Sequence, residues 1–300
     1  MLLSEALKNF LIAQEVIGNS EETILYYKKR IGYFVDYLKD KDTSEISLND
    51  YNSYALYLKN KITKKNLPLS SATIKTSLNA VKIFVRFLYN KQYIKSDFYK
   101  EIKSYKQVKK TIVVLSSDEI KRLLSTQDEN TLIGSRNLLV ISLMLDAGLR
   151  VSEVTNLNVA DINIKLGLIR VFGKGRKERL VPLTDSILKY YKKYIFLSKL
   201  SSGALFIDFD NSLRMTSSGI SQILRRIKKS NNFVKLHPHF LRHTFATLFL
   251  VNGGDPVHLQ LILGHETLYM TENYLHIANQ MTMPEKKKYS PLTNIDTKKA

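Results

Sequence analysis

Hydrophobic residues recur at intervals of three and four through the first hundred positions, which is the spacing of amphipathic helices. Ser47 followed by Asp50 has the form of a capping box, a signal for the start of a helix. Bundles are built from amphipathic helices with short connections, so the pattern predicts a helical bundle over residues 1–104. The apolar positions that define it are Leu7, Phe10, Leu11, Ile24, Tyr27, Ile31, Phe34, several within 51–62, Ile74, Leu78, Val81, Val85 and Leu88.

The helical period stops between Lys95 and Lys110, where the chain is polar and basic. A run of this kind is typical of a connection between domains. We therefore expect a basic linker at 105–112, a second domain at 113–280 and a polar tail at 281–300.

The second domain contains further helix signals. Ser116 and Glu119 form another capping-box pair. The apolar run 137–147 is too continuous for an exposed helix, so it predicts a buried helix that ends at Gly148. The other expected elements are helices at 118–125, 185–199, 217–229, 240–251 and 257–263, with Pro256 at the start of the last, and a short strand at 204–207.

Between positions 161 and 183 the period changes from helical spacing to alternation. The alternation lies on both sides of Gly173-Lys174-Gly175, which predicts a β-hairpin with glycines in its turn. A phosphate-binding P-loop is excluded, because no Ser or Thr follows the lysine and no helix comes next. The fold class is therefore mainly α with a small β-sheet (α+β), in two domains. The basic residues of the hairpin, expected to contact DNA, are Lys174, Arg176, Lys177 and Arg179.

Charge narrows the class of partner. The 300 residues include 46 Lys and Arg against 27 Asp and Glu, a formal net charge of +19, which favours a polyanion and nucleic acid first. Lys75 and Lys82 on the bundle are expected to face a DNA backbone. The absence of cysteine excludes disulfides, thiolate catalysis and Cys-ligated zinc. No apolar run approaches the roughly 18–20 residues that span a bilayer, so we expect a cytoplasmic protein with no membrane partner.

All six histidines lie between positions 237 and 276, which marks this stretch as the candidate for chemistry. A metal site is one hypothesis, since His239 and His243 are four residues apart. Phe240 stands where a metalloprotease helix needs glutamate, so we expect neither metal nor cofactor. A helix-turn-helix without chemistry is a second hypothesis, but it does not explain why Arg242 lies between histidines.

Metal-free phosphoryl transfer is a third hypothesis. It needs cations around the phosphate and a hydroxyl nucleophile. Arg150 and Arg242 are candidate cations, with His239 and His265 as further donors. Tyr274 is the candidate nucleophile. A tyrosine hydroxyl has a pKa near 10, so its anion costs about 4 kcal/mol at neutral pH and needs nearby cations or a base.

Five short motifs follow one another along the second domain. They are AGLRVSEV at 147–154, GKGRKER at 173–179, HFLRHTFAT at 239–247, LGH at 263–265, and Tyr274. With this order and spacing the chain resembles the tyrosine recombinases, also called the phage integrase family, and is most similar in style to the Xer-type recombinases. The resemblance is close over 113–280 and looser over 1–105, where it implies a SAM-like core-binding domain.

The resemblance implies a role for each motif residue. Arg150 and Arg242 would grip the scissile phosphate, and Glu153 would support Arg150. Tyr274 would attack the phosphate to form a 3′-phosphotyrosyl link with DNA. The other implied roles are protonation of the departing 5′ oxygen by Lys174, for which Lys177 is an alternative, phosphate binding and uptake of the tyrosine proton by His239, and phosphate binding by His265.

Other residues of the histidine stretch are expected to be structural: His237, His243, His258 and His276. Tyr269 is an alternative nucleophile, although its distance from His265 along the chain does not fit the family.

The resemblance also implies partners. It implies double-stranded DNA with an inverted-repeat site, a homotetrameric synapse, room for an activating protein, and strand exchange without metal or ATP. Chromosome dimer resolution, with roles in chromosome partition and cell division, and integration or excision of a mobile element are both open. Type IB topoisomerase-like relaxation and a silent DNA-binding protein of the same fold are the alternatives.

Overall fold

A computed structural model describes residues 1–63, 66–106, 113–173, 177–209 and 212–283. Contacts within the chain divide it into two compact units, Met1–Lys110 and Thr111–Ala300. Most of the predicted linker at 105–112 and most of the predicted tail at 281–300 lie outside the described residues.

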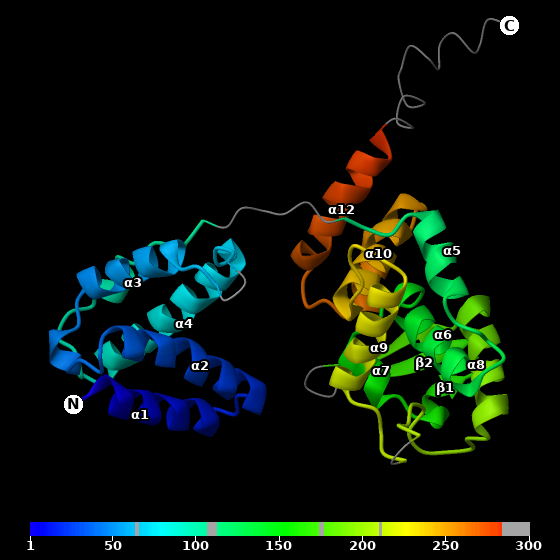
Figure 1. Cartoon of the computed structure of the whole chain (residues 1–300), viewed down its shortest axis with the longest axis horizontal. Coiled ribbons are helices and arrows are strands. Elements are labelled where there is room, and N and C mark those ends of the chain that lie inside the picture. Colours follow the sequence, from blue (N-terminus) through cyan, green and yellow to red (C-terminus); the bar gives the residue numbers. More distant parts are fainter. Residues whose placement is uncertain (64–65, 107–112, 174–176, 210–211, 284–300) are drawn as a thin grey trace, which may run out of the picture. The chain divides into compact units, whose positions relative to one another are not determined.

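The first unit is a helical bundle, as its period predicts (Figure 1). Its core is aromatic at the centre: the Phe10 and Phe84 rings meet edge to face at 5.6 Å, and Phe34 meets Tyr54 in the same way at 5.1 Å. Its helices are α1 (Leu3–Val16), α2 (Glu21–Tyr37), α3 (Leu48–Asn60) and α4 (Ser71–Asn90), with 3₁₀ turns η1 (Thr43–Glu45) and η2 (Phe98–Lys100).

Side-chain caps explain where these helices start. The capping box of Ser47 and Asp50 is present at the first turn of α3, which confirms that prediction. Ser20 caps α2 by accepting from the Thr23 amide, and Ser70 caps α4 in the same way from Thr73. Each cap satisfies an amide that has no partner within the helix.

The segment after α4 differs from its prediction. Phe98 and Ile102 are buried in the core of the first unit, so the chain from Lys95 is not a bare connector over its first part. The Lys82 ammonium donates to the Ile102 carbonyl at 2.6 Å and helps hold the segment there. Because the residues around Phe98 and Ile102 are polar, the sequence pattern did not indicate that these two side chains are buried.

The second unit is mainly helical with one small sheet (Figure 1). The sheet is antiparallel in the order β1-β2-β3, with Ile169 opposite Val181, so the predicted hairpin is confirmed. Its strands are β1 (Ile162–Asn163), β2 (Leu168–Phe172) and β3 (Glu178–Pro182), preceded by the turn η3 (Val159–Asp161). Its helices are α5 (Ser117–Ser125), α6 (Leu132–Leu145), α7 (Val151–Asn156), α8 (Asp185–Ser198), α9 (Ser217–Ser230), α10 (Pro238–Val251), α11 (Pro256–Leu263) and α12 (Tyr269–Met281).

Helix α6 is the buried centre of this unit, as its apolar run predicts. It starts earlier than position 137, however, because Thr131 accepts from the Gly134 amide and caps the helix there. Gly134 therefore belongs to the first turn and not to a preceding loop. A Cβ at this position would lie 1.9 Å from the Asp128 carbonyl oxygen, so the glycine permits a close approach of two backbones.

The predicted strand at 204–207 is wrong. Ala204 and Ile207 form only isolated bridges, with Asn158 and Arg214. Leu205 and Phe206 are fully buried, so the apolar run reflects burial in the core and not pairing in a sheet. In the described part of the chain, no helix combines the length and apolar character needed to cross a bilayer.

Candidate active site

Charged and aromatic side chains from five separate segments meet in the second unit. Arg150 stands at the N-terminus of α7, and a glycine with φ of +65°, Gly148, turns the chain into it from α6. A Cβ on Gly148 would lie 2.4 Å from the Phe245 ring, so α10 packs directly against this turn. The other members are Glu153 on α7, Arg179 on β3, Arg242 and His243 on α10, His265 after α11, and Tyr274 on α12.

One carboxylate lies at the centre of the cluster. Glu153 is 4% exposed and accepts from the Arg150 amide at 2.7 Å and from its guanidinium at 2.8 Å. Arg179 donates to both carboxylate oxygens at 2.8 Å, and an Arg242 nitrogen lies 3.7 Å away. Burial would raise the pKa of Glu153, but the hydrogen bonds and charges of Arg179 and Arg150 outweigh it and lower that pKa.

This arrangement leaves the cluster short of negative charge. Three guanidinium groups surround one carboxylate, which is a surplus of two positive charges before any histidine is counted. A buried surplus of cations is favourable only if an anion joins it. The cluster is therefore suited to an anion such as a phosphodiester.

Arg242 is the most deeply buried of the three arginines. It is 4% exposed and donates to the carbonyl oxygens of Gly148 and Leu263, the latter at 2.7 Å. Burial and the charge of Arg150 lower its pKa to about 10, which leaves it charged at neutral pH. The side chain of Arg150 is 32% exposed, against 5% for Arg242, so Arg150 faces the open side of the cluster.

The position of Arg179 changes its interpretation. It was expected to contact DNA from the hairpin, but its side chain is 12% exposed and its guanidinium is turned onto Glu153. Its Nε also donates to the Ile262 carbonyl at 2.7 Å. Arg179 therefore links the hairpin to α7 and to the end of α11, because a buried carboxylate attracts it more strongly than solvent does.

His265 contacts both an arginine and a threonine. Its Nε2 lies 3.4 Å from the Arg242 guanidinium and its Nδ1 lies 3.1 Å from the Thr271 hydroxyl. Burial, with the charges of Arg242 and Arg150, lowers the pKa of His265 to about 4. The ring is therefore neutral at pH 7, and it accepts from Arg242 when its proton is on Nδ1.

Tyr274 is buried against these groups. It is 6% exposed, and its ring lies parallel to that of His265, with centroids 6.3 Å apart. Burial raises the pKa of its hydroxyl, while the charges of Arg242 and Arg150 act in the opposite direction. Tyr269, the alternative nucleophile, is 73% exposed at the start of the same helix.

His243 is the member of the cluster that the sequence did not predict. Its Nδ1 lies 2.6 Å from the Tyr274 hydroxyl oxygen. We expected it to be structural, although its spacing of four residues from His239 places both histidines on one face of α10. His239, one turn earlier, is exposed; its ring lies 6.4 Å from that of His243, and partial desolvation and Arg242 lower its pKa.

The remaining predicted residues are not brought into the cluster by any described contact. Lys174 and Arg176 lie outside the described residues. Gly173 precedes them, and a Cβ on it would lie 4.0 Å from a Glu153 oxygen, so the base of the hairpin adjoins the cluster. Lys177 is exposed. Lys75 is half-buried, and Lys82 is held by the Ile102 carbonyl.

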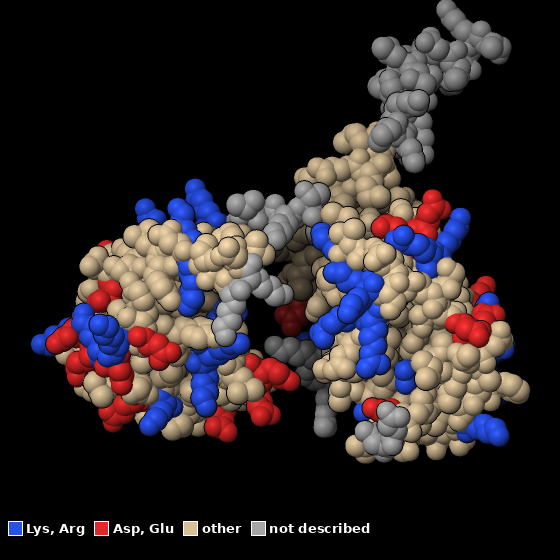
Figure 2. All heavy atoms as spheres, in the orientation of Figure 1, with Lys and Arg blue, Asp and Glu red and all other residues tan. Residues whose placement is uncertain are grey.

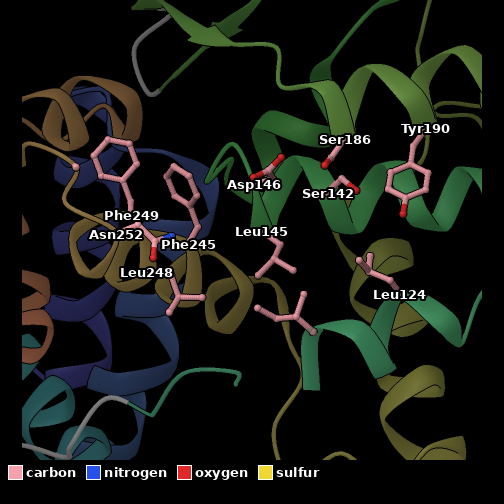
Figure 3. Close-up of a pocket in the computed structure, with 12 residues that line it drawn as sticks. Leu124, Ser142, Leu145, Asp146, Ser186, Tyr190, Phe245, Leu248, Phe249 and Asn252 are labelled. Atoms are coloured by element: carbon pink, nitrogen blue, oxygen red, sulfur yellow. The ribbon is translucent and has the colours of Figure 1, made fainter. Parts of the chain in front are cut away.

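An apolar pocket elsewhere in this unit has different chemistry. Its walls come from α5, α6, α8 and α10, and Figure 3 shows Leu124, Leu145, Phe245 and Phe249 among the residues around it. Its acidic residue, Asp146, already accepts from the Thr184 hydroxyl. Among the described residues, no group of three or more His, Asp and Glu side chains is placed to hold a metal ion.

Basic side chains also gather outside the cluster. On the face drawn in Figure 2, Lys and Arg side chains lie over α9 of the second unit, where Arg225, Arg226 and Lys229 are exposed. We call these three residues the α9 ridge. Such a ridge suits contact with phosphate groups without reading base sequence.

Comparison with known proteins places this site in a family. The model of the phage integrase family matches residues 113–281, and the model of the phage integrase N-terminal SAM-like domain matches residues 5–92. Tyrosine recombinase XerD of Oceanobacillus iheyensis is 33% identical over 286 residues, covering 91% of this chain and 94% of the relative. Tyrosine recombinase XerC of the same organism is 31% identical, covering 92% of each.

Solved structures agree with the fold. XerA recombinase is 28% identical with a TM-score of 0.53 and covers 96% of this chain and 99% of its own. A lambda integrase tetramer bound to a Holliday junction is 16% identical with a TM-score of 0.72, covering 89% of this chain and 78% of its own. The fold and the arginine cluster define a DNA strand transferase of the integrase type. The chain belongs to the phage integrase family and is a site-specific tyrosine recombinase, an enzyme that cuts and rejoins DNA.

Proposed function

We propose that this recombinase cuts DNA by attack of the Tyr274 hydroxyl on a backbone phosphate, forming a 3′-phosphotyrosyl link. The observation that carries the proposal is the position of Tyr274, buried beside Arg242 and His265 in a cluster with surplus positive charge. Cations aimed at the phosphate stabilise the negative charge that develops in the transition state. The tyrosyl ester retains the bond energy, so rejoining needs no ATP.

We propose a role for each residue, and the contacts of the cluster support those of the arginines and of Glu153. Arg150 and Arg242 bind the phosphate oxygens, Arg150 from the open side of the cluster and Arg242 from its buried floor. Glu153 holds the arginines and does not touch DNA. His239 is proposed to contact the phosphate and to take up the proton that Tyr274 loses, and His265 is proposed as a further phosphate contact. Lys174 is proposed to protonate the departing 5′ oxygen, which is supported by the closeness of Gly173 to the cluster.

The DNA partner is proposed to be a duplex site with inverted repeats, bound by two protomers and paired with a second site in a tetramer. A lambda integrase dimer bound to a COC′ core site has a TM-score of 0.73 to this chain, which supports a fold able to engage such a site. Lys177 and the α9 ridge are proposed backbone contacts. An activating protein is compatible with this assembly.

Chromosome dimer resolution is the proposed cellular role. Its support is the match to XerD and XerC relatives over about nine tenths of both lengths. Loss of the gene should give filamentous cells with unpartitioned DNA, and removing homologous recombination, the source of dimers, should relieve the defect. Precise excision of a flanked DNA segment without a partition defect would favour a mobile element instead.

A covalent-trapping experiment tests the chemistry. A duplex selected by its binding to the protein is nicked beside the cleavage position, so that the short product diffuses away and the adduct persists. The wild type should give a DNA adduct resistant to SDS, Tyr274→Phe should give none, and Tyr269→Phe should keep it. An adduct from Tyr274→Phe would contradict the assignment of the nucleophile.

The two alternatives give different results. Tight binding to the duplex without an adduct from the wild type would favour a silent DNA-binding protein. Relaxation of supercoiled plasmids that lack the site would favour the topoisomerase.

A further inference from the structure

The His243–Tyr274 contact is close and specific. The two polar atoms lie 2.6 Å apart, and the ring centroids lie 5.5 Å apart. His243 is half-buried on α10 and Tyr274 is buried on α12, so the pair lies in the seam between the two helices. The roles proposed above for the cluster do not include His243.

The charge states make this a hydrogen bond between two neutral groups. Burial and the neighbouring His239, His237 and Arg242 lower the pKa of His243, so the ring is neutral at pH 7. The pKa of Tyr274 is raised, so the phenol keeps its proton. In the tautomer of His243 that carries its proton on Nε2, Nδ1 accepts from the Tyr274 hydroxyl, and this is the form in which the histidine directs the O–H bond.

Apolar packing holds the rings but leaves the hydroxyl direction to a polar partner. Ala246 of α10 and Ala278 of α12 are both buried, and small side chains let two helices approach closely. His265 lies parallel to the Tyr274 ring on another side. A phenol between such surfaces still needs an acceptor to aim its O–H, and the acceptor the structure supplies is His243.

We propose that His243 is a positioning residue, which holds the Tyr274 hydroxyl in a fixed direction beside the arginine cluster. The inference rests on the proposed function, since it concerns the same nucleophile. Arg242 and His243 are consecutive on α10, so one turn of this helix fixes both a phosphate-binding cation and the attacking group. Small errors in such a placement are costly, since a misplacement of about 1 Å can slow a reaction by roughly a hundredfold.

Two substitutions separate positioning from packing. His243→Asn keeps an oxygen acceptor near the position of Nδ1, whereas His243→Ala removes it. We expect the rate of adduct formation on the nicked duplex to fall on the order of ten- to a hundredfold in His243→Ala and to stay within a few-fold of the wild type in His243→Asn. His258→Ala, at an exposed side chain on α11, is the matched control and should leave the rate unchanged.

A second measurement does not depend on catalysis. Hydrogen exchange of the α12 backbone amides should quicken in His243→Ala and remain near the wild-type rate in His243→Asn. Only the alanine variant loses the side-chain hydrogen bond that links α10 to α12. Thermal melts of both variants establish that each is folded.

The outcomes are distinct for the two proposals. An unchanged or increased adduct rate in His243→Ala, with wild-type adduct present, would overturn the positioning role and leave the function of Tyr274 intact. Equal loss in the Asn and Ala variants would also overturn it. If the wild type forms no adduct on a bound duplex, the proposed function fails, and unchanged α12 exchange in His243→Ala then overturns the positioning role as well.

Discussion

Glu153 has a wider role than its sequence position indicates. The sequence predicts that it supports Arg150, three residues earlier, and that pair is present. The same carboxylate also binds Arg179, 26 residues later in the chain, and lies 3.7 Å from Arg242. The position of each arginine of the cluster therefore depends on one buried side chain, and a change in any partner affects the others.

Arg179 tests this dependence. We expect Arg179→Lys to lower the free energy of unfolding by roughly 1–3 kcal/mol, because lysine keeps the charge but cannot make the two-point contact with Glu153. The rate of adduct formation should also fall in Arg179→Lys. Denaturant titration and the trapping assay measure the two effects.

Lys177→Gln is the matched control for Arg179→Lys. Lys177 is exposed on the same hairpin, so its loss should leave stability unchanged and weaken only DNA binding. A variant at Arg179 that weakened DNA binding but kept full stability would contradict the inward role.

His265 predicts a dependence of stability on pH. Its pKa is about 4 in the folded protein against 6.5 for the ordinary side chain, so the folded state binds fewer protons than the unfolded state between these values. Stability from this group is therefore present above about pH 6.5 and is lost as pH falls toward 4.

The denaturation midpoint between pH 7 and pH 4 checks this sign. The drop should be smaller in His265→Gln than in the wild type, although His237, His239 and His243, whose pKa values are also lowered, contribute in the same window. An identical drop in both proteins would assign the effect to those other histidines.

At the scale of elements, the turn between α6 and α7 sets the site. Gly148 has a left-handed backbone conformation, its carbonyl accepts from Arg242, and its Cα faces Phe245 of α10. Gly148 thus links the end of the buried helix α6 to α10, the helix that carries Arg242. The conformation permits Arg150 to start α7 with its side chain toward Glu153.

Gly148→Ala should destabilise the second unit by about 2–5 kcal/mol, the sum of left-handed strain and overpacking against Phe245. Gly167→Ala is the control, since Gly167 has a similar φ of +64° but nothing within 4 Å of a Cβ. It should cost only about 1–2 kcal/mol. Thermal melts compare the two, and equal shifts would mean that the Phe245 contact relaxes without cost.

Local signals in the sequence sufficed for most elements, whereas contacts between distant residues did not follow from them. Ser47 and Ser116 marked true helix starts because a cap acts within three residues. The early start of α6 and the inward turn of Arg179 depend on tertiary contacts. The partner of Tyr274 is 31 residues away, and no period in the sequence encodes which histidine faces it.

At the scale of the whole molecule, charge is the dominant property. The net charge of +19 exceeds what the arginine cluster contains, so most positive side chains serve other surfaces. Neutralised phosphates release counterions, which makes the affinity for DNA fall steeply with salt. The α9 ridge is one place where this property can be measured.

Replacing Arg225, Arg226 and Lys229 together by glutamine should reduce the slope of log affinity against log salt by about 2 to 3, roughly 0.9 for each phosphate that is no longer neutralised. Adduct formation at saturating protein should persist. Binding to a labelled duplex at several salt concentrations gives the slope. Lys121→Gln is the control, at an exposed side chain on α5, and a triple variant with the slope of this control would remove the ridge from the DNA surface.

The location of Tyr274 on α12 has a consequence for the order in which the protein acquires its abilities. The arginines proposed to bind phosphate are carried by α7 and α10, and a ribosome completes both before it reaches α12. A nascent chain therefore carries the proposed phosphate-binding groups before it carries the proposed nucleophile. On the proposed assignment of Tyr274 as the nucleophile, a chain that has not yet packed α12 on α10 cannot cut DNA.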